Sequence, residues 1–80
     1  MGNKLTLIKR STPVCPSCVA LQMMLENEGI SFNTIDIAEQ PEAIEEYSIA
    51  SVPVLLINDG ETQIKLNGIQ PIELIKEMLE

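Results

Sequence analysis

Two cysteines, three positions apart at the start of an apolar helical segment, constrain this chain more than any other feature. Cys15 and Cys18 are its only cysteines, and the segment from Pro16 to Glu28 contains no other Pro and no Gly before Gly29. Strong helix formers, with Pro in the first turn and Gly just past the end, predict one helix over this segment. Two sulfurs within one helical turn are close enough to form a disulfide and to open it again. We therefore expect a redox-active pair at the N-terminus of a helix, where the partial positive charge favours thiolate.

Apolar runs around that helix predict the strands of an α/β domain. The expected strands are residues 4–9, 30–37, 51–58 and 61–66, and two further helices are expected to begin near Pro41 and Pro71. A helical crossover between the first two strands predicts that they are parallel. Asp59-Gly60 between the last two runs is a strong hairpin signal, so those strands are expected to be antiparallel neighbours. Without repeats or linkers, residues 1–80 are expected to form one domain with the order β-α-β-α-β-β-α.

Helical periodicity also predicts which side chains are buried. The residues that recur at helical spacing are Cys18, Leu21 and Leu25, with Met24 beside them, in the first helix, and Ile72, Ile75 and Leu79, with Leu74 and Met78 adjoining, in the last. We expect Val19 and Met23 to widen the first of these stripes. In the short middle helix, Ile44 is the expected inward residue, with Tyr47 on the neighbouring turn.

The charge of the chain excludes some partners. A net charge of −7, with a pI near 4.3, leaves nothing that could neutralise a row of phosphates, so we expect no nucleic acid partner. The acids gather in residues 39–46 and at Glu73, Glu77 and Glu80, where they match solvated helix faces. No apolar run approaches the roughly 20 residues that span a bilayer, so no membrane partner is expected. Met1 to Arg10 lacks the long apolar core of a signal peptide, and two cysteines are too few for a secreted disulfide framework, which predicts a reducing cytoplasm.

The position of each cysteine predicts its role. Cys15 lies at or just before the helix start, where unpaired N–H groups favour thiolate, and is the expected exposed nucleophile. Cys18 lies one turn inside the helix and is the expected, more buried, resolving thiol. Two alternatives remain: a pair of ordinary structural cysteines, or half of a metal site. With no His and no further Cys, zinc or an iron–sulfur cluster would need ligands from a second copy of the chain.

Val52-Pro53 is the second sequence feature of interest. A proline inside a strand-like run is expected at the first residues of the strand, here just before Val54 to Ile57. From the sequence alone a trans peptide bond is the default, because only about one X-Pro bond in twenty is cis.

These residues resemble a known family over essentially the whole chain. Cys15-Pro16-Ser17-Cys18 after the first strand, Ser51-Val52-Pro53 before the third and Gly68 after the fourth are similar to the glutaredoxin branch of the thioredoxin fold. Ile35-Asp36-Ile37, Pro41-Glu42-Ala43 and Asn67-Gly68-Ile69-Gln70-Pro71 resemble the NrdH-redoxins most, which are glutaredoxin-like in sequence and thioredoxin-like in behaviour.

The resemblance implies a thioredoxin-like fold with a four-stranded mixed sheet in the order 2-1-3-4, flanked by helices. It also implies that Pro53 is cis and lies against the cysteines, that Val52 offers its backbone to an extended substrate, and that Gly68 allows close approach beside the same groove. The substrate-binding residues implied by the resemblance are Pro16, Ser17, Val52, Pro53, Gly68 and Ile69. The catalytic residues are Cys15 and Cys18.

The family transfers electrons by dithiol exchange through its redox-active disulfide, with no bound cofactor. Its substrates are protein disulfides, typically in a ribonucleotide reductase, and the reductant is thioredoxin reductase with NADPH or, in ordinary glutaredoxins, glutathione. We expect a monomer.

The chain departs from the family pattern at a few positions. Glutaredoxins usually have an aromatic residue where Ser17 stands, and Gly-Gly followed by acids where this chain has Asn67-Gly68-Ile69-Gln70. Ile69, Gln70 and Ile72 replace the Phe, Arg and Asp that NrdH-redoxins tend to show. These departures leave the reductant and the substrate open. Lys9 and Arg10 are both candidates for the family's basic residue near the thiolate, and the longer loop before Cys15 leaves that assignment open too.

Overall fold

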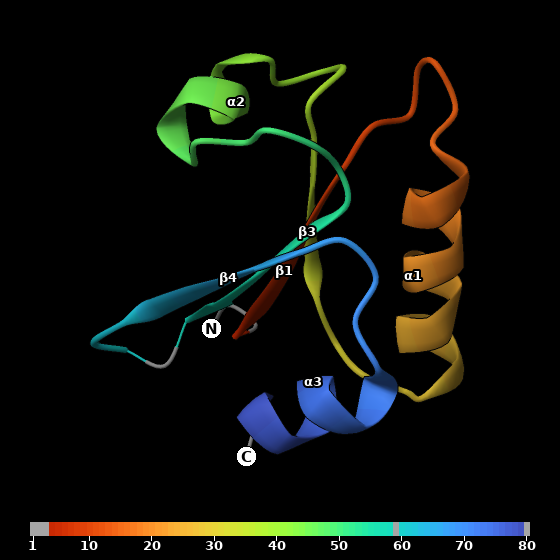
Figure 1. Cartoon of the computed structure of the whole chain (residues 1–80), viewed down its shortest axis with the longest axis vertical. Helices are drawn as coiled ribbons and strands as arrows, with labels where there is room; N and C mark the ends of the chain where they lie inside the picture. The colour runs from red at the N-terminus through yellow and green to blue at the C-terminus, as the bar shows by residue number, and fades with distance from the viewer. Residues whose placement is uncertain (1–3, 59, 80) are drawn as a thin grey trace.

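Four strands form one mixed sheet, and three helices lie on its two faces (Figure 1). The computed structural model describes residues 4–58 and 60–79. In chain order the elements are β1 (Leu5–Lys9), α1 (Pro16–Asn27), β2 (Asn33–Asp36), α2 (Glu42–Glu46), β3 (Val54–Asn58), β4 (Gln63–Asn67) and α3 (Ile72–Leu79). The sheet order is β2-β1-β3-β4, with β1 parallel to β2 and antiparallel to β3, and β3 antiparallel to β4. The predicted α/β architecture, element order and strand order are confirmed. Asp59, the first residue of the Asp59-Gly60 pair that predicted the hairpin, lies outside the described residues.

The end of α1 explains why β2 is shorter than predicted. Gly29, at φ +68°, donates its N–H to the carbonyl of Glu26, and Ile30 donates to the carbonyl of Leu25 at 3.0 Å. This is the Schellman arrangement, which completes the hydrogen bonds at a helix C-terminus. The N–H of Ile30 is thereby used by the helix, and β2 begins at Asn33 rather than at residue 30.

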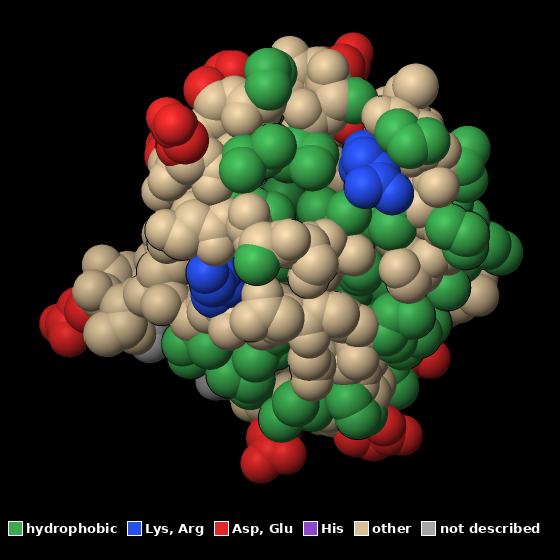
Figure 2. All heavy atoms as spheres, turned by 45° about the horizontal axis from the view of Figure 1, so that its top comes forward, with side chains coloured by type: hydrophobic (Ala, Val, Ile, Leu, Met, Phe, Trp, Pro, Cys, Tyr) green, Lys and Arg blue, Asp and Glu red, His purple; other side chains and the backbone are tan. Residues whose placement is uncertain are grey.

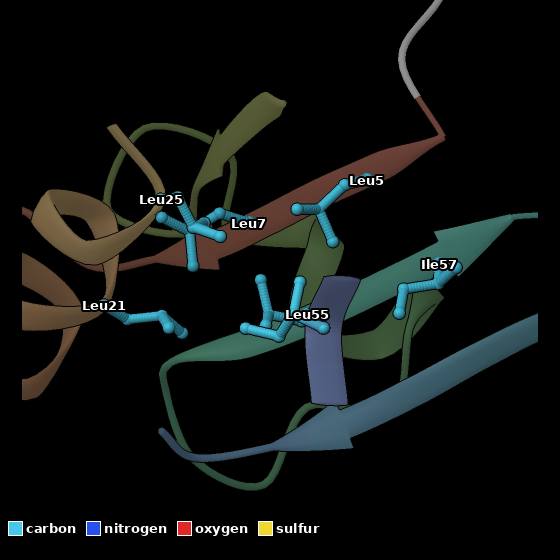
Figure 3. Packing of buried hydrophobic residues seen from close by; sticks show 7 residues of the cluster. Leu5, Leu7, Leu21, Leu25, Leu55 and Ile57 are labelled. Atoms are coloured by element: carbon cyan, nitrogen blue, oxygen red, sulfur yellow. The ribbon is translucent and has the colours of Figure 1, made fainter. Parts of the chain in front are cut away.

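The larger apolar cluster lies between the sheet and the two helices α1 and α3. Alternate residues of β1 and β3 point to this face, because side chains alternate along a strand. The buried members are Leu5, Leu7, Leu21, Leu25, Leu55, Ile57 and Ile75, six of which are labelled in Figure 3. Partly buried side chains around the cluster include Ile72, Met78 and Leu79 of α3, as the periodicity of that helix predicts. The prediction that Leu74 adjoins them is wrong, since its side chain is 36% exposed.

The other face of the sheet carries a smaller cluster below α2. Its buried members are Ile8, Val54 and Leu56, and partly buried Ile35, Ile37, Tyr47, Ile49 and Val52 pack against them. The buried residue of α2 itself is Ala43. The prediction that Ile44 points inward is wrong, since its side chain is 40% exposed. The small side chain of Ala43 faces the sheet instead, and the next residue of a helix points about 100° away.

The prediction that Val19 and Met23 widen the buried stripe of α1 is also wrong. These side chains are 49% and 54% exposed, while Cys18, Leu21 and Leu25 are buried as predicted. Only a narrow stripe of α1 faces the sheet, and none of the described helices and strands covers Val19 and Met23. Within the part of the chain that the structure describes, no helix is long and apolar enough to cross a membrane.

Candidate active site

Cys15 forms the N-cap of α1, and Pro16 is the first residue of the helix. The backbone N–H of Cys18 donates to the Sγ of Cys15 at 3.3 Å, and the N–H of Val19 donates to the carbonyl of Cys15 at 3.1 Å. The first turn of α1 contains no acidic side chain. Free N–H groups and the helix dipole therefore favour negative charge on Cys15 when the pair is reduced.

The two cysteines are joined by a disulfide, with their Cα atoms 5.2 Å apart. The Oγ of Ser17 lies 3.5 Å from the Sγ of Cys15. Cys15 is only 4% exposed and Cys18 2% exposed. In this oxidised form Cys15 is therefore buried rather than exposed as predicted. Ser17 and the carbonyl of Val52, which is 4.0 Å from the sulfur, lie against it.

The fold brings Val52, Pro53 and Gly68 to the same place. The Val52–Pro53 peptide bond is cis, as the resemblance implies and contrary to the trans default from sequence alone. The N–H of Gly68 donates to the carbonyl of Pro53 at 2.9 Å, so the end of β4 lies beside the residue that precedes β3. The Thr12–Pro13 bond is also cis, which nothing in the sequence indicated.

Gly68 and Val52 leave open space and unpaired backbone near the disulfide. Gly68 has φ +78°, and a Cβ placed on it would meet no atom within 4 Å. Among the described residues, the backbone N–H and carbonyl of Val52 form no hydrogen bond with another backbone group. A substrate strand could pair with this free backbone. Of the other residues implied by the resemblance, Pro16 and Ile69 are exposed and Ser17 is partly buried.

Lys9 and Arg10 both lie near the cysteines. Together with residues 11, 14, 15, 18, 19 and 22 they line a cavity of about 200 Å³, which we call the α1-side pocket. Lys9 donates from Nζ to the Oε1 of Gln22 at 3.3 Å, and Arg10 donates from Nε to the carbonyl of Pro13 at 3.1 Å. Both residues therefore share a pocket with the cysteines, but the hydrogen bonds of their charged groups go to Gln22 and to the Pro13 carbonyl rather than to a sulfur.

Asp36 fixes the loop that leads to Cys15. Its Oδ1 accepts from the backbone N–H groups of Ser11 at 3.1 Å and Ala38 at 3.0 Å. Hydrogen bonding from the side chain of Ser11 lowers the pKa of Asp36 most, and the backbone N–H groups of Ala38 and Ser11 and the charge of Lys9 lower it further, against desolvation. Sequence reasoning assigned this residue no role, although an acid between two isoleucines at a strand end was a usable signal.

A second cavity, of about 210 Å³, lies on the α2 side of the disulfide. Its lining is formed by Arg10, Ile37, Ile44, Ile49 and residues 50–52, and we call it the α2-side pocket. Figure 2 shows the end of the molecule that carries α2 and the start of α1: hydrophobic side chains gather there beside a basic one, and acids lie toward the margin. Sequence reasoning missed this pocket, because it forms only where three separate segments meet.

Over residues 4–58 and 60–79, no group of three or more His, Cys, Asp or Glu side chains could hold a metal ion.

Comparisons with known proteins agree with this geometry. A family model described as Glutaredoxin matches residues 6–61. The SPbeta prophage-derived thioredoxin-like protein YosR of Bacillus subtilis (strain 168) is 36% identical over 70 residues, which cover 85% of this chain and 88% of that protein.

Solved structures with the same fold include two redoxins. NrdH-redoxin from Escherichia coli, a glutaredoxin-like protein described as having a thioredoxin-like activity profile, is 25% identical, with a TM-score of 0.72 over 90% of this chain and 91% of that one. A glutaredoxin from Archaeoglobus fulgidus is 26% identical, with a TM-score of 0.70 over 98% of this chain and 87% of that one. The chain, with its thioredoxin-like fold and its cysteine pair, belongs to the glutaredoxin family.

Proposed function

We propose that this protein is a small dithiol oxidoreductase that carries electrons to protein disulfides, with Cys15 as nucleophile and Cys18 as resolving thiol. The observation that supports this most strongly is the disulfide at the N-terminus of α1, against Val52 and next to the Pro53–Gly68 pair. A structural disulfide would not need a free strand-like backbone beside it.

The reaction consists of two exchanges. In the reduced protein, the Cys15 thiolate attacks one sulfur of the substrate disulfide, an S–S bond forms between Cys15 and the substrate, and the other substrate sulfur leaves as a thiolate that takes up a proton. Cys18, as thiolate, then attacks the Sγ of Cys15 and releases the second substrate thiol. The substrate gains two electrons and two protons, and the protein becomes the Cys15–Cys18 disulfide seen here.

The surroundings of Cys15 suit the first exchange. The N–H of Cys18 already points at the Sγ of Cys15, and no acid in the first turn opposes a negative charge there. Cys18 lies one turn further into the helix and is buried, so it reaches Cys15 more readily than it reaches a bulky substrate. The free backbone of Val52 would hold the substrate as an added strand.

We further propose that thioredoxin reductase, with NADPH, recharges the protein, and that it acts as a monomer in the cytoplasm. The segment after β4 is Asn67-Gly68-Ile69-Gln70, without the acids that hold glutathione in ordinary glutaredoxins, and the similar NrdH-redoxin has a thioredoxin-like activity profile. A ribonucleotide reductase, the usual substrate of NrdH-redoxins, is the first protein substrate to try.

A coupled assay tests the proposal. The oxidised protein, a protein disulfide and NADPH are mixed either with thioredoxin reductase or with glutathione and its reductase, and NADPH consumption is followed. We expect turnover with thioredoxin reductase and little with glutathione, and none for Cys15→Ser in either mixture. Turnover that survives in Cys15→Ser would refute the assignment. Stoichiometric zinc or iron in dimeric purified protein would instead support a metal-binding module.

A further inference from the structure

The α2-side pocket is connected to the cysteine site through two of its own lining residues. Val52 lines the pocket, and its carbonyl lies 4.0 Å from the Sγ of Cys15. Arg10 lines both this pocket and the α1-side pocket that contains the cysteines. Successive residues of an extended strand are about 3.3 Å apart. A substrate strand paired with Val52 therefore places a side chain near its attacked cysteine within reach of the pocket.

The apolar part of the lining suits an aliphatic side chain. Ile37 follows β2, Ile44 belongs to α2 and Ile49 follows α2, so three segments contribute apolar surface. An engineered apolar cavity of about 150 Å³ binds benzene, and this pocket, at about 210 Å³, has room for one Leu or Ile side chain. Ile44 is 40% exposed and is not among the side chains that pack against the smaller cluster, whereas Ala43 is the buried residue of α2.

Arg10 gives the pocket a charge preference. Within the described part of the chain, Arg10 forms no ion pair, and its Nε–H donates to the carbonyl of Pro13. The guanidinium carries further N–H donors that suit a carboxylate. None of the described acidic side chains lines the pocket, although the exposed Glu42, Glu45 and Glu46 occupy the same short helix as Ile44. On a chain with net charge −7, this is a local site of attraction for an anion.

We infer that the α2-side pocket selects the substrate: it takes an aliphatic side chain one or two residues from the attacked cysteine of a protein disulfide, with a carboxylate on the same segment paired to Arg10. The inference rests on the proposed function, because it assumes that Cys15 attacks a bound peptide.

Three synthetic peptides, each closed by one disulfide, test the inference. The first carries Leu and Glu beside its cysteines, the second has Ser in place of Leu, and the third has Gln in place of Glu. Pre-reduced protein is mixed with each peptide, and the rate of reduction is divided by the rate with bis(2-hydroxyethyl) disulfide, which is uncharged and too small to fill the pocket. We expect the Ser peptide to react about tenfold more slowly than the first. We expect the Gln peptide to react about threefold more slowly at low salt, and this second difference to disappear in high salt.

Variants of the pocket identify the residues responsible. Ile44→Ser should remove the preference for Leu, and Arg10→Gln should remove the preference for Glu. Leu74→Ser on α3 and Lys4→Gln, which change matched residues outside the pocket, should keep both preferences. Ile44 is exposed enough for the variant to fold, and circular dichroism verifies this.

Two negative outcomes are distinguishable. Equal rates with all three peptides, or preferences that persist in Ile44→Ser and Arg10→Gln, would overturn the inference while leaving the oxidoreductase function standing. No reaction with any disulfide, the small one included, would overturn the proposed function and the inference with it.

Discussion

The two faces of the sheet use their apolar residues differently. On the face covered by α1 and α3, seven buried side chains form one cluster, and α1 and α3 supply three of them. On the face covered by α2, the buried cluster has three members, all from strands, and α2 contributes only the small Ala43 to the interior. Ile37 and Ile49 pack against this cluster with part of their surface and, together with Ile44 of α2, also line the α2-side pocket. The first face provides most of the stability, and the second leaves apolar surface available for binding.

Substitutions of two adjacent residues of β3 are expected to give the largest difference in stability between the two faces. Leu55 and Leu56 point to opposite faces and belong to the larger and the smaller cluster respectively. We expect Leu55→Ala to lower the free energy of unfolding by about 4 kcal/mol and Leu56→Ala by about 2 kcal/mol, because the smaller cluster can relax around the cavity. Urea denaturation of the oxidised protein measures both. An equal or larger loss for Leu56→Ala would remove the distinction between the faces.

A second pair of variants tests α2 itself. Ala43→Leu should cost about 2 kcal/mol of unfolding free energy, because a larger side chain cannot fit between the helix and the sheet. Ile44→Ala should cost at most about 0.5 kcal/mol, as is usual for an exposed residue. The same denaturation experiment measures both, and a large loss for Ile44→Ala would show that this side chain belongs to the core after all.

Gly68 follows β4 and donates its N–H to the carbonyl of Pro53, next to the cysteine site. Gly68→Ala should lose about 1 kcal/mol of stability, because a residue with a Cβ is strained at φ +78°. Gly29→Ala is the matched control, with φ +68° and equally open space around its Cβ. We expect similar stability losses for both variants, but a severalfold lower rate of disulfide reduction only for Gly68→Ala, whose methyl group would occupy the open space next to Pro53. Equal rates in the two variants would place the substrate elsewhere.

The smallest expected effect on stability concerns Asp36, which accepts hydrogen bonds from Ser11, in the loop before Cys15, and from Ala38. Its pKa in the folded protein is lowered from the ordinary value of 3.8, so the carboxylate adds stability above that pH. This contribution is lost as the pH falls through 3.8 toward the lower folded value. Wild type should therefore lose more stability between neutral and acid pH than Asp36→Asn, as thermal unfolding at a series of pH values would show. If the plots of unfolding temperature against pH were parallel for the two proteins, the hydrogen bonds from Ser11 and Ala38 to Asp36 would contribute nothing to the pH dependence of stability.

The face of the sheet covered by α1 and α3 was predicted better from the sequence than the face that carries α2 and the α2-side pocket. Leu21, Leu25 and Ile75 are buried as helical periodicity indicates, and the strand order follows from the resemblance and agrees with the hairpin and crossover signals. Periodicity failed at Val19, Met23 and Ile44, because it shows that a residue is apolar but not whether another element covers it. The short α2 has too few residues for its orientation to be set by its own pattern.

The surroundings of the cysteines were predictable in part. The N-cap position of Cys15 follows from local sequence, since Pro16 and Gly29 mark the ends of the helix. The cis bond at Pro53 came from the family resemblance, because local preference favours trans. The α2-side pocket depends on where the end of β1 meets α2 and the segment before β3, which is a property of the folded chain alone.

Trapping of the covalent intermediate tests the central claim, that Cys15 attacks and Cys18 resolves. Reduced Cys18→Ser is mixed with the Leu- and Glu-containing disulfide peptide, and the product is analysed by intact mass and by mapping of the modified cysteine. We expect a stable adduct of one peptide, linked to Cys15, and none with Cys15→Ser under the same conditions. An adduct on Cys18 in Cys15→Ser, or no adduct on Cys15 in Cys18→Ser, would contradict that claim.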